Sequence, residues 1–220
     1  MMLWQQIKDL LFPPKCVLCH ALLENEETDL CASCRKDAPG VAGRREKIRY
    51  LADWTGVWYY EKEVRKSLHR YKFKNRRGYA ACYGQLLAMA VARDLPQVDV
   101  LTWVPISASR KRKRGYDQGE LLARAVAAEL GLELQPLLQK VRDNPPQSSV
   151  QGAEARRANV LGVFTAAGNV AGKRILLLDD ILTTGATASE CARVLRTAGA
   201  QEVYAAAVAV ARKNNNKTSR

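Results

Sequence analysis

The amino-acid sequence predicts an α/β protein with a central, mostly parallel sheet flanked by helices and preceded by a small four-cysteine module. Two local patterns support this prediction: an apolar run ending in paired acids at residues 175–187, and four cysteines within residues 16–34. The length of 220 residues also suits a full α/β core with an appended module. We expect an amino-terminal helix and the cysteine module within 1–45, the α/β domain within 46–212, and a basic disordered tail at 213–220.

The composition is that of a globular protein with a strong positive charge. Lys and Arg number 35 against 22 Asp and Glu, so the formal net charge is +13. This surplus exceeds what solubility requires and indicates polyanionic partners, among which phosphorylated substrates, nucleic acid and anionic lipid all fit. Because no stretch approaches the roughly twenty apolar residues of a membrane span, and residues 1–14 lack a secretory signal, we expect a cytoplasmic protein without a membrane span.

Four of the six cysteines follow the spacing Cys-X2-Cys-X11-Cys-X2-Cys. They are Cys16, Cys19, Cys31 and Cys34. Two such knuckles can place four thiolates tetrahedrally around Zn²⁺, and a segment this small has too little core to fold unaided. The redox alternative needs one Cys-X2-Cys beside a βαβ pattern, whereas both pairs here precede any such pattern. We therefore predict a structural zinc site, and we expect Cys82 and Cys191, in Ala-rich helical segments, to be buried thiols.

Residues 175–187 predict a binding site at one edge of the sheet. Four consecutive apolar residues suit a strand covered on both faces, which delivers Asp179 and Asp180 to the carboxyl edge, where open α/β folds bind ligands. The loop after them can surround a phosphate with backbone N–H groups and hydroxyls, at the positive end of a helix starting near Ala188. These loop residues are Thr183, Thr184, Gly185, Ala186 and Thr187. The alternative is a buried strand and a capped helix, which leaves the adjacent acids unexplained.

Basic and aromatic residues are interleaved over residues 44–77. Cations for phosphates and flat rings for bases are what a single-stranded nucleic acid requires. The same stretch also fits an ordinary strand at 56–60 and a helix at 64–71 with a solvated basic face. Both interpretations stay open.

A second anion site is expected after a strand at 98–104, which ends at the same sheet edge. Its candidate residues are Ile106, Ser107, Arg110 and Arg114. The run of five cations at 110–114 can neutralise a pyrophosphate or a nucleic-acid backbone, and a solvated loop is the other interpretation. Residues 137–159 are polar without a sustained period, so we expect a functional flap or a disordered insert with Arg142 among its working residues. The remaining expected elements are helices at 120–130 and 188–198 and strands at 160–164 and 203–210.

All thirteen residues of 175–187 agree with the signature of type I phosphoribosyltransferases. This signature and several other motifs together resemble those of the ComF family of competence proteins, and the resemblance covers nearly the whole chain. Those motifs are the four-cysteine module, Val104-Pro105, Arg114-Gly115-Tyr116-Asp117-Gln118, Pro146-Gln147 and Arg157-Ala158-Asn159-Val160. The family commonly has Arg-Gly-Phe-Asn-Gln where this chain has Tyr116 and Asp117, and the extra acid weakens a role of Asp117 in phosphate binding. The resemblance implies a type I phosphoribosyltransferase-like fold behind a zinc finger.

The resemblance also implies a site for phosphoribosyl pyrophosphate with Mg²⁺. Asp179 and Asp180 would hold the ribose hydroxyls, and residues 183–187 would form the cradle of the 5′-phosphate. Ile106 and Ser107 would face the pyrophosphate, with Arg142 or the cluster at 110–114 closing over it. We expect a protein that binds this or a related phosphosugar and handles incoming single-stranded DNA, with a helicase-like competence partner. The alternative is an active phosphoribosyltransferase for an unidentified acceptor in nucleotide salvage.

Overall fold

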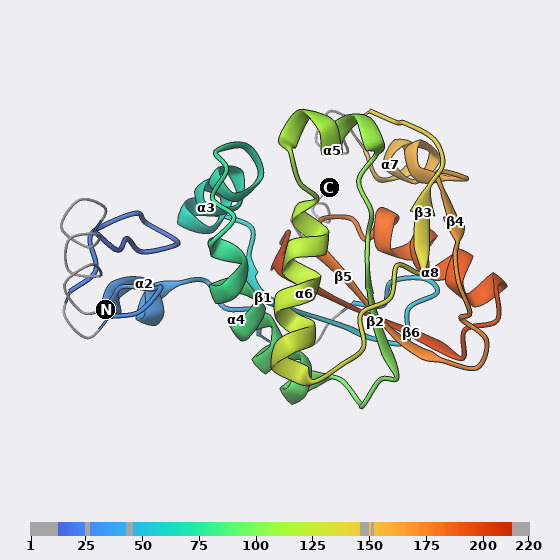
Figure 1. Ribbon diagram of the computed structural model, residues 1–220, viewed down its shortest axis with the longest axis horizontal. Helices are drawn as coiled ribbons and strands as arrows, with labels where there is room; N and C mark the ends of the chain where they lie inside the picture. The colour runs from blue at the N-terminus through green and yellow to red at the C-terminus, as the bar shows by residue number, and fades with distance from the viewer. Residues whose placement is uncertain (1–12, 25–26, 43–45, 146–149, 151, 213–220) are drawn as a thin grey trace, which may run out of the picture.

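The computed structural model describes residues 13–24, 27–42, 46–145, 150 and 152–212 (Figure 1). The expected amino-terminal helix, the Pro146-Gln147 motif and the basic tail lie outside the described residues. A cysteine-rich module stands beside a layered α/β domain.

The main sheet has four parallel strands among the described residues. In spatial order they are β1 (Trp54–Tyr59), β6 (Glu202–Val210), β5 (Arg174–Leu182) and β2 (Val100–Trp103). Leu178 pairs with Ala206 on one side and with Trp103 on the other, so β5 is an interior strand. Because the strands are parallel, their carboxyl ends share one edge, as the sequence predicts.

Helices and a small two-stranded sheet cover the two faces of this main sheet. One face packs against α3 (Lys62–Phe73), α4 (Tyr79–Asp94) and α6 (Gln118–Leu130). The other packs against α8 (Ala186–Thr197) and the antiparallel pair β3 (Leu138–Lys140) and β4 (Phe164–Ala166). Side chains along β5 alternate between these two cores, which explains the unbroken apolar run in its sequence.

The predicted elements agree with the structure except near the binding edge. The cations at 110–114 do not form a solvated loop, because they lie in α5 (Ala108–Arg114), where Ser107 accepts the Arg110 N–H and Gly115 ends the helix at a φ of +76°. Arg and Lys are good helix formers, so a basic run favours a helix once both caps are present.

The expectation of an irregular flap or insert over residues 137–159 is wrong for two segments of the stretch. It contains β3 and α7 (Ala153–Val160), and the strand expected at 160–164 lies instead at β4. A three-residue strand is too short to show a period, and its partner supplies the hydrogen bonds that hold it in place.

The cysteine module is packed onto the α/β domain. It includes α2 (Ala32–Asp37), and its buried residues Val17 and Leu18 belong to the same core as α3 and α4. Ser67 of α3 donates a hydrogen bond to the Val17 carbonyl, and Arg70 donates to the carbonyls of Val17 and Leu18. In Figure 1 the module lies beside α3 accordingly.

Two further expectations concern single residues and the membrane. Cys82 in α4 and Cys191 in α8 are both buried, which confirms their prediction as core thiols. None of the helices in the described part of the chain combines the length and the apolar character that crossing a membrane requires.

Candidate functional site

The four predicted cysteine ligands come together in the module. The sulfur atoms of Cys16, Cys19, Cys31 and Cys34 all lie within 4.8 Å of one another, and those of Cys19 and Cys31 are 3.7 Å apart. Sulfur atoms about 2.3 Å from a tetrahedral zinc ion lie about 3.8 Å from each other, so this cluster fits Zn²⁺. The Cys34 N–H donates to the Cys31 sulfur at 3.5 Å, which supports a thiolate at that position.

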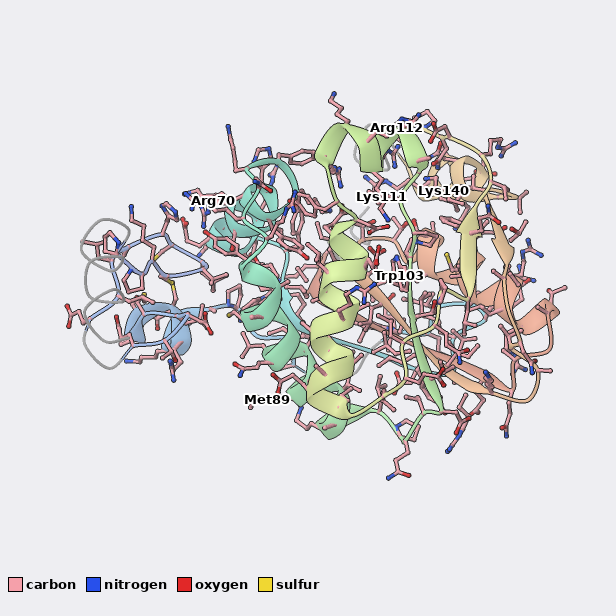
Figure 2. The ribbon with its side chains drawn as sticks, in the orientation of Figure 1. Arg70, Met89, Trp103, Lys111, Arg112 and Lys140 are labelled. Carbon is pink, nitrogen blue, oxygen red and sulfur yellow. The ribbon has the colours of Figure 1, made fainter. Side chains whose placement is uncertain are left out.

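A second, larger site opens at the carboxyl edge of the sheet. It is a cavity of about 1380 Å³ whose lining includes Asp179, Asp180, Thr183 and Thr187. In Figure 2, Arg70 lies over α3 and Lys140 lies at the end of β3, with α5 between them in this view. The cavity therefore lies between the carboxyl end of β5, the helices α3 and α5, and the β3 strand.

The paired acids stand at the end of β5, where the strand leaves its buried section. The Asp180 N–H donates to Asp179 Oδ1 at 2.8 Å, and Asp180 itself is 6% exposed. Its Oδ1 lies 2.8 Å from the Lys72 ammonium nitrogen of α3. Its Oδ2 is buried and has no hydrogen-bond partner among the described residues. Lys72 thus pairs with one carboxylate oxygen of Asp180, and the other, buried oxygen can still accept a hydrogen bond.

Burial, and next the charge of Asp180, raises the pKa of Asp179 to about 8, against an opposing influence of Lys72. A carboxyl whose pKa is raised by folding stabilises the folded state fully below its ordinary pKa of about 4, and this contribution is lost as the pH rises through about 8. Asp179→Asn should therefore lose less stability than the wild type between these pH values, by up to a few kcal/mol. Urea unfolding across this range measures the difference.

Lys72→Met is the matched variant for this prediction. Removing the cation that lowers the pKa of Asp179 should extend the decline in stability to higher pH. Identical pH profiles for the wild type and Asp179→Asn would contradict the assignment of this titration to Asp179.

The loop after the acids leads straight into α8. Gly185 has a φ of +73°, and a Cβ there would lie 2.8 Å from a side-chain carbon of Ile48, so only glycine suits this position. Thr184 Oγ1 accepts the Ala186 N–H at 3.4 Å, while Thr183 is exposed and lines the cavity with Thr187. Because α8 begins two residues earlier than predicted, its amino terminus points its positive end at the loop itself.

Only some residues of the second predicted anion site line the cavity. They are Ile106, Arg110 and Arg114. Ser107 is 5% exposed, is not among the described lining residues, and uses its hydroxyl to cap α5. The Ile106 N–H donates to Asp117 Oδ2 at 3.3 Å, so the fold already uses this amide.

Asp117 has a structural role at this point. Its carboxylate caps α6 by accepting the Gly119 and Glu120 N–H groups at 2.8 and 3.2 Å, and it also accepts from Trp103 Nε1. Burial raises its pKa, while these hydrogen bonds lower it. The acid that distinguishes this chain from the common family motif therefore ties the loop after β2 to α6.

Cations dominate the lining of the cavity. Those on α3 are Lys62, Arg65, Lys66, Arg70 and Lys72. Those on other elements are Arg110, Lys113, Arg114, Lys140 and Arg156. The acids among the described lining residues are Asp179 and Asp180, so the site as a whole attracts anions.

Arg142 and Lys140 show where sequence reasoning missed the site. Arg142 is exposed, donates to the Leu161 carbonyl at 2.8 Å, and is not one of the described residues around the cavity. Lys140 lines it instead, donating to Asn144 Oδ1 at 2.6 Å, and burial, followed by the charge of Arg110, lowers its pKa to about 8. No sequence signal marked Lys140, whereas Lys72 lay within the basic and aromatic stretch at 44–77.

Two family models match parts of the chain. A double zinc ribbon domain model matches residues 7–45, and a phosphoribosyl transferase domain model matches residues 116–220. With the geometry of the four sulfur atoms, the first match assigns the cysteines to a structural zinc site.

Several bacterial proteins are similar over much of the chain. Competence protein F of Haemophilus influenzae is 25% identical over 215 residues, covering 86% of this chain and 93% of that protein. Competence protein ComFC of Streptococcus pneumoniae is 29% identical over 188 residues, covering 84% and 77%. DNA utilization protein YhgH of Salmonella typhi is 31% identical over 142 residues, covering 62% of each chain.

One solved structure illustrates the similarity to proteins of known structure. The glutamine phosphoribosylpyrophosphate amidotransferase from B. subtilis aligns with a TM-score of 0.44 and 25% identity, covering 62% of this chain. This chain spans 30% of the length of that enzyme.

Proposed function

Because this chain belongs to the ComF family of competence proteins, we propose that it binds phosphoribosyl pyrophosphate or a related phosphosugar and takes part in handling incoming single-stranded DNA. One observation carries the proposal: paired acids, a helix amino terminus and ten cations line a single cavity. A sugar that bears phosphates needs these three kinds of group together. We place its action in the cytoplasm, with a helicase-like competence protein as a partner.

The sugar and its 5′-phosphate would lie between β5 and α8. Carboxylates accept strongly from hydroxyl groups, and Asp180 Oδ2 retains a buried acceptor position for a ribose hydroxyl beside Asp179. The 5′-phosphate would be held by the loop at 183–187, whose helix of twelve residues presents its positive end there. Thr183 and Thr187 supply hydroxyls at the cavity wall.

The pyrophosphate would face α5 and the loop before it. Arg110 and Arg114 line that side of the cavity, and Ser107 would act through the start of α5 rather than by direct contact. Arg142, also predicted to close over the pyrophosphate, donates to the Leu161 carbonyl in this structure and would have to leave that contact to reach the ligand.

The donor set also fits Mg²⁺. Hard cations prefer carboxylate and phosphate oxygens, and Asp179, Asp180 and the ligand's own phosphates would hold the ion. When bound, Mg²⁺ neutralises charge on the pyrophosphate group. Lys72 on Asp180 Oδ1 balances part of the negative charge of the pair from the protein side.

An active phosphoribosyltransferase is the second candidate function, and Lys140 is the observation that favours it. Lys140 is a half-buried amine at the cavity wall, and because its pKa is lowered to about 8 a minor fraction of it is neutral near pH 7 and can accept a proton from an incoming nucleophile. Release of pyrophosphate on addition of a candidate acceptor, lost in Lys140→Met, would identify this activity. If no nucleobase or nucleoside triggers pyrophosphate release, the transferase activity is rejected and the binding function alone stands.

Titration calorimetry tests the proposed binding. The zinc-loaded protein should take up about one phosphoribosyl pyrophosphate per chain when Mg²⁺ is present, and the affinity should fall when chelator replaces Mg²⁺. Ribose 5-phosphate should bind more weakly, because it lacks the group that α5 faces. A folded, zinc-loaded protein that gives no saturable heat would reject the phosphosugar part of the proposal.

A further inference from the structure

We propose that the cavity-facing side of α3, with Arg114, is a binding track for one strand of nucleic acid, and that the ring of Phe73 is its base-stacking platform. The strand track consists of Lys62, Arg65, Lys66, His69, Phe73 and Arg114, all of which line the cavity. The inference deepens the DNA-handling part of the proposed function, on which it rests.

The helical spacing places the basic residues of the track on one side of α3. Residues 62, 65, 66, 69 and 73 follow one another at steps of three, one, three and four, so they form a stripe about 16 Å long. All five are exposed, whereas Val64, Leu68 and Tyr71 on the opposite side are buried in the core. The stripe therefore faces outward from a helix whose other side is fixed.

The stripe ends in an exposed aromatic ring. Phe73 is 56% exposed, and its ring lies 4.9 Å from that of His69 at a tilt of 46°. The Arg114 guanidinium lies 4.8 Å from the Phe73 ring centre and donates to Gln118 Oε1 at 2.6 Å. A flat ring supported by a cation, with accessible surface remaining, is the arrangement on which an unpaired base stacks.

The track is held rigidly by contacts on the far side of α3. Tyr71 donates to the Gln118 carbonyl at 2.7 Å, and Tyr116 donates to the Tyr71 carbonyl. Ser67 and Arg70 bind carbonyls of the zinc module. Because these contacts order the helix before any partner arrives, little entropy is lost there on binding.

A single strand fits these features better than a duplex or an acidic protein. Phosphates can pair with the cations of the stripe while the adjacent base stacks on Phe73, and a duplex keeps its bases stacked inside. An acidic protein would use the cations but would give the exposed ring no specific role.

Fluorescence anisotropy with two labelled strands tests the platform. The probes are an oligothymidylate of about twelve nucleotides and a strand of the same length with abasic sites, each added to the full zinc-loaded chain. Phe73→Ala should weaken the oligothymidylate about tenfold or more, Phe73→Trp should restore it, and neither should change binding of the abasic strand. Met89→Ala, which removes a 69% exposed side chain of α4 away from the cavity, should bind both strands like the wild type.

The inference is overturned if Phe73→Ala binds oligothymidylate like the wild type, or if it loses both strands equally. Binding of phosphatidylserine vesicles that depends on Phe73, without binding of oligothymidylate, would also overturn it in favour of a lipid surface.

The cations of the track are tested through the salt dependence. Arg65→Gln with Lys66→Gln should reduce the slope of log affinity against log salt by about one for each phosphate that these side chains neutralise in the wild type. Arg174→Gln removes one charge at the start of β5, on the opposite edge of the sheet, and should leave the slope unchanged. An unchanged slope in the double variant would place the strand elsewhere.

Calorimetry on the same variants separates this inference from the phosphosugar proposal. Phe73→Ala removes a ring packed on Arg114 but no group placed against the sugar or its phosphates, so it should keep phosphoribosyl pyrophosphate binding within a few-fold of the wild type. If it does, but oligothymidylate binding is also unchanged, the track is wrong and the phosphosugar site stands. If oligothymidylate binding depends on Phe73 and no phosphosugar binds, the strand track stands and the phosphosugar site is wrong.

Discussion

Replacing both Asp179 and Asp180 with asparagine is expected to abolish Mg²⁺-dependent binding of phosphoribosyl pyrophosphate. The change removes both carboxyl groups that would face the ribose and the metal ion, the charged Asp180 and the Asp179 whose pKa burial raises. Hydrogen bonds to charged groups contribute about 1.5–3 kcal/mol each, so the loss of two should weaken affinity by about a hundredfold or more, roughly 3–6 kcal/mol. Titration calorimetry on the zinc-loaded variant measures this loss.

The double variant should stay folded. Asparagine nearly matches the shape of aspartate and ends the repulsion between the two adjacent acids, although it also leaves Lys72 without its carboxylate partner. Asp99→Asn is the control, because Asp99 pairs with Arg174 at the opposite edge of the sheet. This control should bind the ligand like the wild type. A folded double variant with unchanged affinity would show that the paired acids are not the ribose site.

Replacing Cys31 with serine is expected to remove the zinc and to unfold the cysteine module. A structural zinc ion supplies apparent binding energies of about 10–16 kcal/mol in small zinc domains, and here that energy holds a segment with little core of its own. Unfolding would withdraw Val17 and Leu18 from α3, and the exposed core should make the variant aggregate. Metal analysis and thermal unfolding measure both effects.

Cys82→Ala is the control for the zinc prediction. Cys82 is a buried thiol of α4 that lies outside the cluster of four, so the variant should keep one zinc per chain and lose only modest stability. A wild-type protein that is well folded without zinc would contradict the structural role of the metal.

Periodicity and motif spacing predicted the parts of the fold that depend on local pattern. The apolar run before Asp179 predicted an interior strand, because a strand buried on both faces has apolar side chains at every position instead of at alternate ones. Four cysteines at the right spacing predicted their own cluster, because two Cys-X2-Cys knuckles on a short connector can place four thiolates around one ion.

The sequence could not predict interactions that depend on tertiary packing. The contact of Lys72 with Asp180 joins two elements more than a hundred residues apart, and neither residue type indicates the other. Lys140 lies on a three-residue strand that forms only because β4 pairs with it, so its approach to the cavity had no local signal. Arg142 was predicted as a cation of an expected flap, and its bond to the Leu161 carbonyl depends on a packing that no local pattern indicates.

A crystal structure of the protein with phosphoribosyl pyrophosphate and Mg²⁺ tests the central claim most directly. The ribose should lie against Asp179 and Asp180, with its 5′-phosphate on the loop at 183–187 and its pyrophosphate toward Arg110 and Arg114. Ligand density outside this cavity, or none at saturating concentration with Lys72 still paired to Asp180, would contradict the phosphosugar site.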